Sequence, residues 1–256
     1  MTNDAALGEA LADIVEEAGA EILALWRSGI AVDRKTDESP VTEADRRGEA
    51  LILKALAERF PDIPVISEED ACESGTPAKI GPRFFLVDPL DGTKAFVRGD
   101  EHWTVNIGLI QDGRPVAGAV SAPAWRRTWF TTSEGARLRK IGESADEPIR
   151  VRAWPATGAV ALVSHTMKSE QEAELRRRYG YGETLAMDSS AKLCMVAEGT
   201  ADIYPRHGTT MEWDIAAAHA VLEAAGGSLT TEEGQPFAYG KCDQGFKNGW
   251  FVARGG

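Results

Sequence analysis

Cysteine and histidine are both scarce in this chain of 256 residues, which contains three and four of them respectively. The cysteines lie far apart, and neither their odd number nor their spacing suits a disulfide framework or a zinc site. Basic residues are fewer than acidic ones, 28 against 40, which gives a formal net charge of −12. This balance argues against a broad basic surface for nucleic acid or for an anionic membrane. No apolar run approaches the length that spans a bilayer.

Familiar nucleophile and nucleotide motifs are missing as well. The chain contains no Gly-x-Ser-x-Gly elbow and no P-loop. The N-terminal segment is acidic and amphipathic, without the basic and apolar regions of a signal peptide. With 43% hydrophobic and 27% charged residues, the composition is that of an ordinary globular protein. We therefore expect a soluble protein of the cytoplasm, with contact to the inner membrane at most peripheral.

Hydrophobic periodicity predicts a mixture of helices and short strands. The predicted helices cover residues 4–28, 43–60, 169–179, 189–198 and 213–225. The predicted strands cover residues 65–66, 84–87, 104–110, 116–121, 128–132, 160–163, 201–204 and 251–252. A charged connector at 143–148 divides the chain into expected subdomains 1–145 and 146–256. Helices layered on sequential strands predict an α/β or α+β sandwich.

The most informative segment is the hexapeptide DPLDGT, which runs from Asp88 to Thr93. A buried strand delivers Asp88 and Asp91 to its end, where both carboxylates can point at one hard cation. The backbone amides after Gly92 can bind an oxyanion if a helix begins there. An ordinary Asp-Pro/Asp-Gly turn explains the same residues, so the hexapeptide alone leaves both interpretations open.

Three further acidic clusters stand at strand ends or helix starts, at residues 43–45, 68–70 and 212–214. Each has a simpler explanation by itself: a helix cap, a solvated face, or acids favoured by a helix dipole. Together they place carboxylates beside segments that should be buried, which is costly unless cations compensate the charge. The joint pattern predicts an oxygen-only magnesium site in which a second metal aligns water and leaving group.

These motifs resemble the signatures of the magnesium-dependent, lithium-sensitive phosphatases of the inositol monophosphatase superfamily. DPLDGT preceded by Ser67-Glu68-Glu69 is similar to the first signature, and residues 213–227 are similar to the second. The resemblance extends from about Lys35 to the C-terminus. It implies a layered αβαβα sandwich, with an N-terminal antiparallel sheet that carries two helices and a smaller C-terminal mixed sheet.

Residues 94–110, 189–206 and 211–214 resemble one branch, the bacterial 3'(2'),5'-bisphosphate nucleotidases of the CysQ type. That branch removes the 3'-phosphate of 3'-phosphoadenosine 5'-phosphate, giving AMP and phosphate, in sulfate assimilation. Two alternatives stay open. One is a phosphatase of the same superfamily that acts on inositol 1-phosphate or on another sugar, polyol or histidinol phosphate. The other is a catalytically silent domain that binds phosphorylated metabolites.

The resemblance implies a role for each acidic residue. A first magnesium ion would bind Glu68, Asp88 and the Leu90 carbonyl; a second would bind Asp88, Asp91 and Asp214. A third, weaker cation would contact Glu68, giving two or three Mg²⁺ per site. Catalytic roles are implied for Thr93, Asp45 and Glu69. Thr93 and Asp45 would orient and deprotonate the attacking water, and Glu69 would orient a metal-bound water. The amides of Gly92 and Thr93 would bind the phosphate.

Similarity also suggests substrate contacts, from Ser190, Lys192, Arg206 and Glu212. Two positions depart from the family pattern: Asp188 replaces a usual glycine, and Thr209 replaces a usual proline. An extra acid beside a phosphate pocket is expected to weaken anion binding, so these departures concern the substrate. The expected partner is a small phosphorylated nucleotide, with no nucleic acid and no membrane embedding, and the expected assembly is a monomer or a homodimer.

Overall fold

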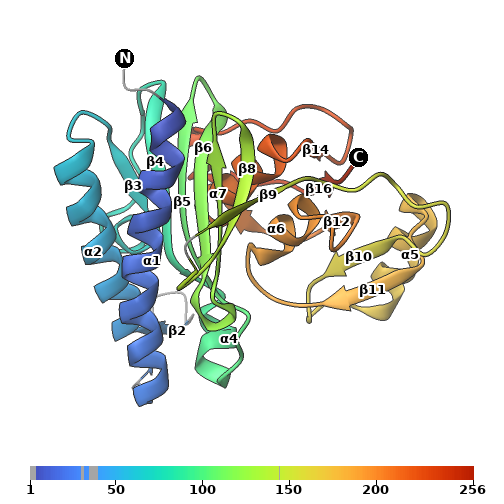
Figure 1. The fold of residues 1–256 in the computed structure, drawn as a ribbon, viewed down its shortest axis with the longest axis horizontal. Helices are drawn as coiled ribbons and strands as arrows, with labels where there is room; N and C mark the ends of the chain where they lie inside the picture. Colours follow the sequence, from blue (N-terminus) through green and yellow to red (C-terminus); the bar gives the residue numbers. More distant parts are fainter. Residues whose placement is uncertain (1–3, 30–31, 35–39, 144) are drawn as a thin grey trace.

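Two long helices, α1 (Asp4–Ser28) and α2 (Glu43–Arg59), cover one face of the larger β-sheet (Figure 1). The structure is a computed structural model that describes residues 4–29, 32–34, 40–143 and 145–256, so Lys35 lies outside the described residues. Both helices were predicted within one residue of their ends. Their apolar faces pack with Phe85 and Ile107 of the sheet in one hydrophobic cluster.

The larger sheet has seven strands in sequence order. They are β3 (Val65–Ser67), β4 (Arg83–Asp91), β5 (Thr104–Gln111), β6 (Arg114–Ala122), β7 (Arg127–Thr132), β8 (Gly135–Lys140) and β9 (Asp146–Ile149). Every neighbouring pair is antiparallel except β3 and β4, which run parallel at one edge. The expected antiparallel sheet is therefore present with one parallel pair, because the short helix α3 (Glu68–Ser74) and the loop after it return the chain for β4 in the same direction.

The second sheet has five strands, in the order β11 (Glu183–Ala186), β10 (Val160–Val163), β12 (Ile203–Arg206), β16 (Phe251–Arg254) and β14 (Ser228–Thr231). The first three are parallel and the last two pairings are antiparallel, which gives the mixed sheet that was predicted. Helix α5 (Ser169–Tyr179) covers its outer face through Leu175. Helices α6 (Ala191–Ala197) and α7 (Glu212–Ala224) lie between the two sheets (Figure 1). The layered αβαβα architecture is thus confirmed.

Strand β9 belongs to the larger sheet, so that sheet continues past the connector where the sequence suggested a boundary. The described connector residues adjoin residue 144, which lies outside the described ranges. Helix α7 comes from the C-terminal half of the chain and packs on β5 and β6 of the larger sheet. Because both halves share this helix, a division into subdomains 1–145 and 146–256 stays a prediction.

Helix α7 lies unusually close to the sheet because two glycines face it. A Cβ atom on Gly118 would come within 2.5 Å of the Ala217 carbonyl oxygen, and one on Gly108 within 2.8 Å of the Ala217 nitrogen. Real Cβ atoms do not approach backbone so closely. The helix meets the sheet with alanines, Ala216 and Ala217, and its first turn carries Asp214, which lines the same cavity as Asp91 of β4.

Two short elements carry the residues of the pocket. The helix α4 (Thr93–Arg98) follows β4 after Gly92, and the pair β13 (Thr210–Met211) and β15 (Lys247–Asn248) leads into α7. A two-stranded ladder, β1 (Val32–Arg34) with β2 (Pro40–Thr42), precedes α2. No helix in the described ranges has the length and apolarity to cross a membrane. All three cysteines are free.

Candidate active site

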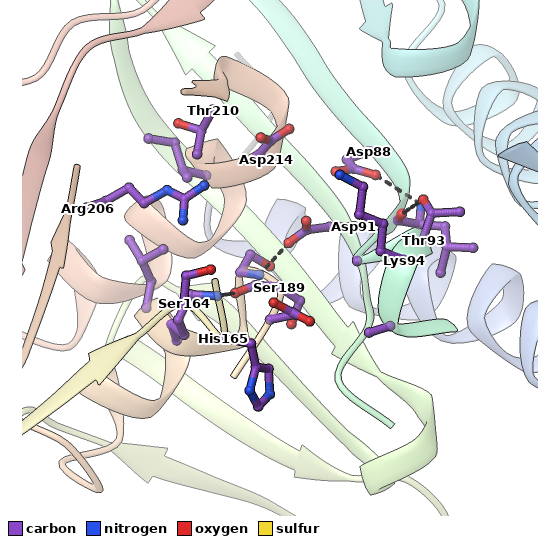
Figure 2. A pocket seen from close by; sticks show the side chains of 18 of the residues that line it. Asp88, Asp91, Thr93, Lys94, Ser164, His165, Ser189, Arg206, Thr210 and Asp214 are labelled. Carbon is purple, nitrogen blue, oxygen red and sulfur yellow. Dashed lines mark hydrogen bonds between the residues drawn. The ribbon is translucent and has the colours of Figure 1, made fainter. Parts of the chain in front are cut away.

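A cavity of about 480 Å³ lies where the end of β4 meets the starts of α6 and α7 (Figure 2). Residues from both halves of the chain line it. The hexapeptide forms one wall, and the loops before α5, α6 and α7 form the others. The lining includes these sequence-predicted residues: Glu68, Asp88, Leu90, Asp91, Gly92, Thr93, Ser190, Lys192, Arg206 and Asp214. It does not include Asp45, Glu69 or Glu212.

Four carboxylates form an acidic wall on this cavity: Glu68 at the start of α3, Asp88 and Asp91 in β4, and Asp214 in the first turn of α7. The pairing of β4 with β5 is interrupted between Asp88 and Asp91, so both side chains leave the sheet at this irregularity. The Asp88 carboxylate is buried and accepts a hydrogen bond from the Leu90 amide at 3.0 Å. Figure 2 shows Asp88, Asp91 and Asp214 around the same hollow.

The acidic wall concentrates buried negative charge, which raises the pKa of two of its carboxylates. Burial raises the pKa of Asp91 to about 6, with a further rise from the Glu68 charge and opposing effects from Lys192, the Ser190 amide and Arg206. Burial also raises the pKa of Asp214 well above its ordinary value, and the charges of Asp91 and Glu68 add to the rise. Carboxylates held this way favour either a proton or a cation.

The donor set suits magnesium. It comprises four carboxylates and the backbone carbonyl of Leu90, without thiol or imidazole, which is the oxygen-only chemistry that Mg²⁺ prefers. In the described part of the chain, no three acidic, histidine or cysteine side chains are already drawn together as a closed ligand set.

Thr93 and Asp45 form a hydrogen-bonded pair at the base of the cavity. The Thr93 hydroxyl donates to Asp45 Oδ1 at 3.4 Å and lies 3.1 Å from the Leu90 carbonyl oxygen. The other Asp45 oxygen accepts from the amide and the hydroxyl of Thr42, both at 2.7 Å. The capping box that begins α2 thereby fixes Asp45, which is buried behind Thr93. A hydroxyl held by a buried carboxylate is suited to orienting a water and taking its proton.

Gly92 turns the chain from β4 into α4. Its φ is 95°, in the left-handed region, and a Cβ atom there would come within 2.7 Å of the His102 carbonyl oxygen. Both constraints require glycine at this position. The turn presents the amides that open α4 to the cavity, beside the Thr93 hydroxyl.

Ser190 and Lys192 are buried and already engaged. The Ser190 amide donates to Asp91, and its hydroxyl bonds Asn106 at 2.7 Å and Thr104 at 2.9 Å. The Lys192 ammonium donates to the Ser189 carbonyl at 2.6 Å and to the Met187 carbonyl at 3.2 Å. Burial lowers the pKa of Lys192 to about 8, against the opposing Asp91 charge. Ser190 therefore joins the start of α6 to the acidic wall, whereas Lys192 holds the backbone before α6, and both line the cavity.

Two other cationic side chains enter from opposite walls. Arg206 ends β12 and lies near Asp214, with its Nη2 atom 3.4 Å from the Thr209 carbonyl oxygen. Its buried Nε atom has no hydrogen-bond partner in the described residues. Lys94 in α4 was not predicted; its side chain extends along the acidic wall toward Asp88 (Figure 2).

Glu212 and Glu69 lie away from the cavity. The fully buried Glu212 carboxylate accepts from the amides of Gly240 and Lys241, at 2.7 and 3.0 Å, and pairs with the Lys241 ammonium at 2.8 Å. It anchors the loop after β14, so the structure does not place it in contact with a substrate in the cavity. Glu69 is buried in the first turn of α3, with its own amide bonded to Glu49.

Several cavity residues escaped the sequence analysis. Arg98 at the end of α4 pairs with Asp188 across the cavity, although ninety positions separate them. His165 lies at the mouth and stacks on His102, with ring centroids 5.8 Å apart. Of these contacts, only the one at Asp188 had a signal in the sequence, because Asp188 replaces a usual glycine. An added acid near an anion site needs a cation to balance its charge.

Comparison with known proteins gives a consistent picture. A model of the inositol monophosphatase family matches residues 5–251. Among curated proteins, the 3'(2'),5'-bisphosphate nucleotidase CysQ of Salmonella typhimurium is 36% identical over 90% of this chain and 93% of its own length. The enzyme of the same name from Escherichia coli K12 is 38% identical, over 80% of this chain and 81% of its own.

Solved structures agree in fold. CysQ from Bacteroides thetaiotaomicron, described as a bacterial member of the inositol monophosphatase family, superposes with a TM-score of 0.80 at 32% identity, covering 98% of this chain and 97% of that one. An inositol monophosphatase from Thermotoga maritima superposes with a TM-score of 0.75 at 23% identity, covering 94% and 89%. The latter likeness speaks for the fold alone.

Proposed function

The chain belongs to the inositol monophosphatase family, and we propose that it hydrolyses the 3'-phosphate of 3'-phosphoadenosine 5'-phosphate, giving AMP and phosphate. The observation that carries this proposal is a cavity that joins an acidic wall to cationic side chains, with Lys192 and Arg206 near Asp91 and Arg98 also in the lining. Such a cavity suits a substrate with two phosphates, one beside the carboxylates and one beyond them. The similarity to 3'(2'),5'-bisphosphate nucleotidases over most of the chain supports the same substrate.

We propose that Glu68, Asp88, the Leu90 carbonyl, Asp91 and Asp214 hold two or three magnesium ions. Bound magnesium supplies charge neutralisation on phosphate oxygens and lowers the pKa of water. The raised pKa values of Asp91 and Asp214 support this assignment, because each carboxylate is disfavoured in its charged form until a cation arrives.

In the proposed reaction, Thr93 orients the attacking water and passes its proton toward Asp45. The 3.4 Å contact between their side chains supports this pairing, and the two 2.7 Å bonds from Thr42 keep Asp45 in place. The amides of Gly92 and Thr93 point at the phosphate from the start of α4. Glu69 acts from behind Glu68, through its position in α3 and not through contact with the substrate.

Lys192 and Arg206 contribute positive charge between the acidic wall and the rest of the cavity. Both lower the pKa of Asp91, so each is close enough to offset the repulsion between carboxylates and an incoming phosphate. Ser190 holds Asp91 through its amide and thereby joins the second ligand set to α6. We also propose a reducing cytoplasm as the location, which the three free cysteines support.

A phosphate-release assay tests the proposal directly. With magnesium present, we expect release from 3'-phosphoadenosine 5'-phosphate and its loss in EDTA or in Asp91→Asn. A strong preference for inositol 1-phosphate in the same assay would move the chain to another branch of the family. Failure to release phosphate from either substrate, with magnesium binding intact, would favour a catalytically silent phosphometabolite-binding domain.

A further inference from the structure

An ion pair spans the cavity between α4 and the loop before α6. The Arg98 Nη2 atom lies 2.8 Å from Asp188 Oδ2 and 3.1 Å from Asp100 Oδ2. Arg98 and Asp188 both line the cavity, and they belong to opposite halves of the chain. The Asp188 side chain is 21% exposed and that of Arg98 is 50% exposed. Pairs with this exposure stabilise a fold very little.

The Arg98 guanidinium is only partly used by these contacts. Nη2 serves both carboxylates, while Nε and Nη1 donate no hydrogen bond to any described residue. An arginine fork binds phosphate through two parallel N–H groups. Both forks of this guanidinium include Nη2, which the two carboxylates hold, so Nε and Nη1 keep N–H groups that can each donate singly to an anion.

The position of Arg98 sets it apart from the other cations of the cavity. Lys192 and Arg206 both lower the pKa of Asp91, and Arg206 also lowers that of Asp214, so their charges lie at the acidic end. The pKa of Arg98 is raised by Asp188 and Asp100, and Asp188 also raises the pKa of Lys192. Thr93 begins α4 and Arg98 ends it, which separates them by roughly 7.5 Å of helix rise. Arg98 is thus displaced from the reacting end by about the length of that helix.

We propose that Arg98 binds the phosphate that is not hydrolysed, and that Asp188 is the positioning residue that aims Arg98 at it. This inference rests on the proposed function and deepens it. It also accounts for the acid at position 188, because Asp188 holds the Arg98 guanidinium. The cavity then selects a nucleoside bisphosphate over a nucleoside with one phosphate.

Binding of AMP tests Arg98 without turnover, because AMP keeps the 5'-phosphate and lacks the 3'-phosphate. Titration of magnesium-loaded protein should show AMP binding weakened about tenfold or more in Arg98→Ala, as expected for charge-assisted hydrogen bonds. Adenosine, without a phosphate, should bind both proteins alike. Arg47→Ala is the matched control: Arg47 is 51% exposed, pairs with Glu21 and Glu43, and lies outside the cavity.

Steady-state kinetics supply the second arm. Arg98→Ala should raise KM for 3'-phosphoadenosine 5'-phosphate about tenfold with little change in kcat, and leave KM for adenosine 3'-monophosphate within about twofold. Asp188→Asn should raise KM for the bisphosphate in the native background, because Arg98 loses its aim. In the Arg98→Ala background the same change should lower KM, because an unpaired acid is removed.

Each contrary result has a definite meaning. Equal loss for both substrates in Arg98→Ala would overturn the inference, as would unchanged AMP binding. If Asp188→Asn lowered KM in both backgrounds, Asp188 would only repel the substrate and would not position Arg98. Failure of the native protein to release phosphate from the bisphosphate would instead reject the proposed function, before any variant is compared.

Discussion

Asp214 opens helix α7 beside Asp91, which ends strand β4, and after burial the Asp91 charge is the strongest cause of the raised pKa of Asp214. The two carboxylates come from segments more than a hundred residues apart in the sequence. Their mutual repulsion makes the metal-free site a source of instability, which a divalent cation would remove. Three of the following predictions concern this relationship or the groups around it.

Magnesium should stabilise the native protein more than the Asp91→Asn variant, which loses a ligand of the second ion. A ligand present at a hundred times its dissociation constant adds about 2.7 kcal/mol to the free energy of unfolding. For a chain of this size that corresponds to a rise in Tm of several degrees. Thermal unfolding with magnesium and with EDTA measures it. Without metal, Asp91→Asn should melt above the native protein, and a lower Tm there would contradict the repulsion.

The pH dependence of stability should follow the raised pKa of Asp91, which moves from 3.8 to about 6 on folding. A raised carboxyl pKa gives stability that is complete below the unfolded value and is lost as pH rises through the folded one. Without metal, the native protein should therefore lose stability relative to Asp91→Asn between about pH 4 and pH 6. Urea unfolding of the two proteins across that range measures the difference between their free energies of unfolding. The contributions of most other titrating groups cancel in that difference. A constant difference would show that Asp91 titrates normally.

Removing the Thr93 hydroxyl should slow the reaction without weakening substrate binding. Positioned proton transfer contributes about 10² to 10⁴ in rate, so Thr93→Val should lower kcat by a factor in that range and leave KM nearly unchanged. Thr93→Ser, which keeps the hydroxyl, is the control. Asp45→Asn should lower kcat too, and the double variant should cost less than the product of the two losses. Full additivity would mean that the residues act separately.

Glu212→Gln should affect stability and not substrate affinity. The carboxylate pairs with Lys241 and accepts two backbone amides in a fully buried position. Weakening a buried charged acceptor costs about 1 to 3 kcal/mol. Denaturant unfolding should show that loss, while KM for the bisphosphate stays within about twofold. A large rise in KM with unchanged stability would restore the substrate contact expected from the sequence.

Gly118→Ala should destabilise the fold, because the new methyl group meets the Ala217 backbone at 2.5 Å and neither element can yield. Overpacking of this kind costs about 1 to 3 kcal/mol. Gly81→Ala is the control, because nothing lies within 4 Å of a Cβ atom there. Urea midpoints of the two variants measure the contrast. Equal midpoints would mean that α7 can move away from the sheet.

The sequence predicted those features that depend on local pattern. The long helices, most strands and the four acidic clusters were found because periodicity and contiguous motifs carry them. The helix cap considered for residues 43–45 depends on local pattern too, and in the structure Thr42 and Asp45 form it.

The features that the sequence did not predict depend on contacts between distant segments or on the direction in which a side chain points. Arg98 and Asp188 meet only because α4 and the loop before α6 face one cavity, which no local pattern encodes. Glu212 was grouped with Asp214, but two residues along a helix turn the side chain by roughly 200°, so the second carboxylate faces the cavity while the first faces the loop at 240–241. The parallel edge of the larger sheet likewise follows from the path of the chain after β3.

At Gly108 and Gly118, no side chain of the larger sheet separates its backbone from Ala217 of α7. This close backbone contact limits how far the two halves of the acidic wall can move relative to each other. A site held in this way has little freedom to widen for a larger ion. Discrimination between magnesium and bulkier divalent ions would then originate in the sheet, well away from the carboxylates that bind them.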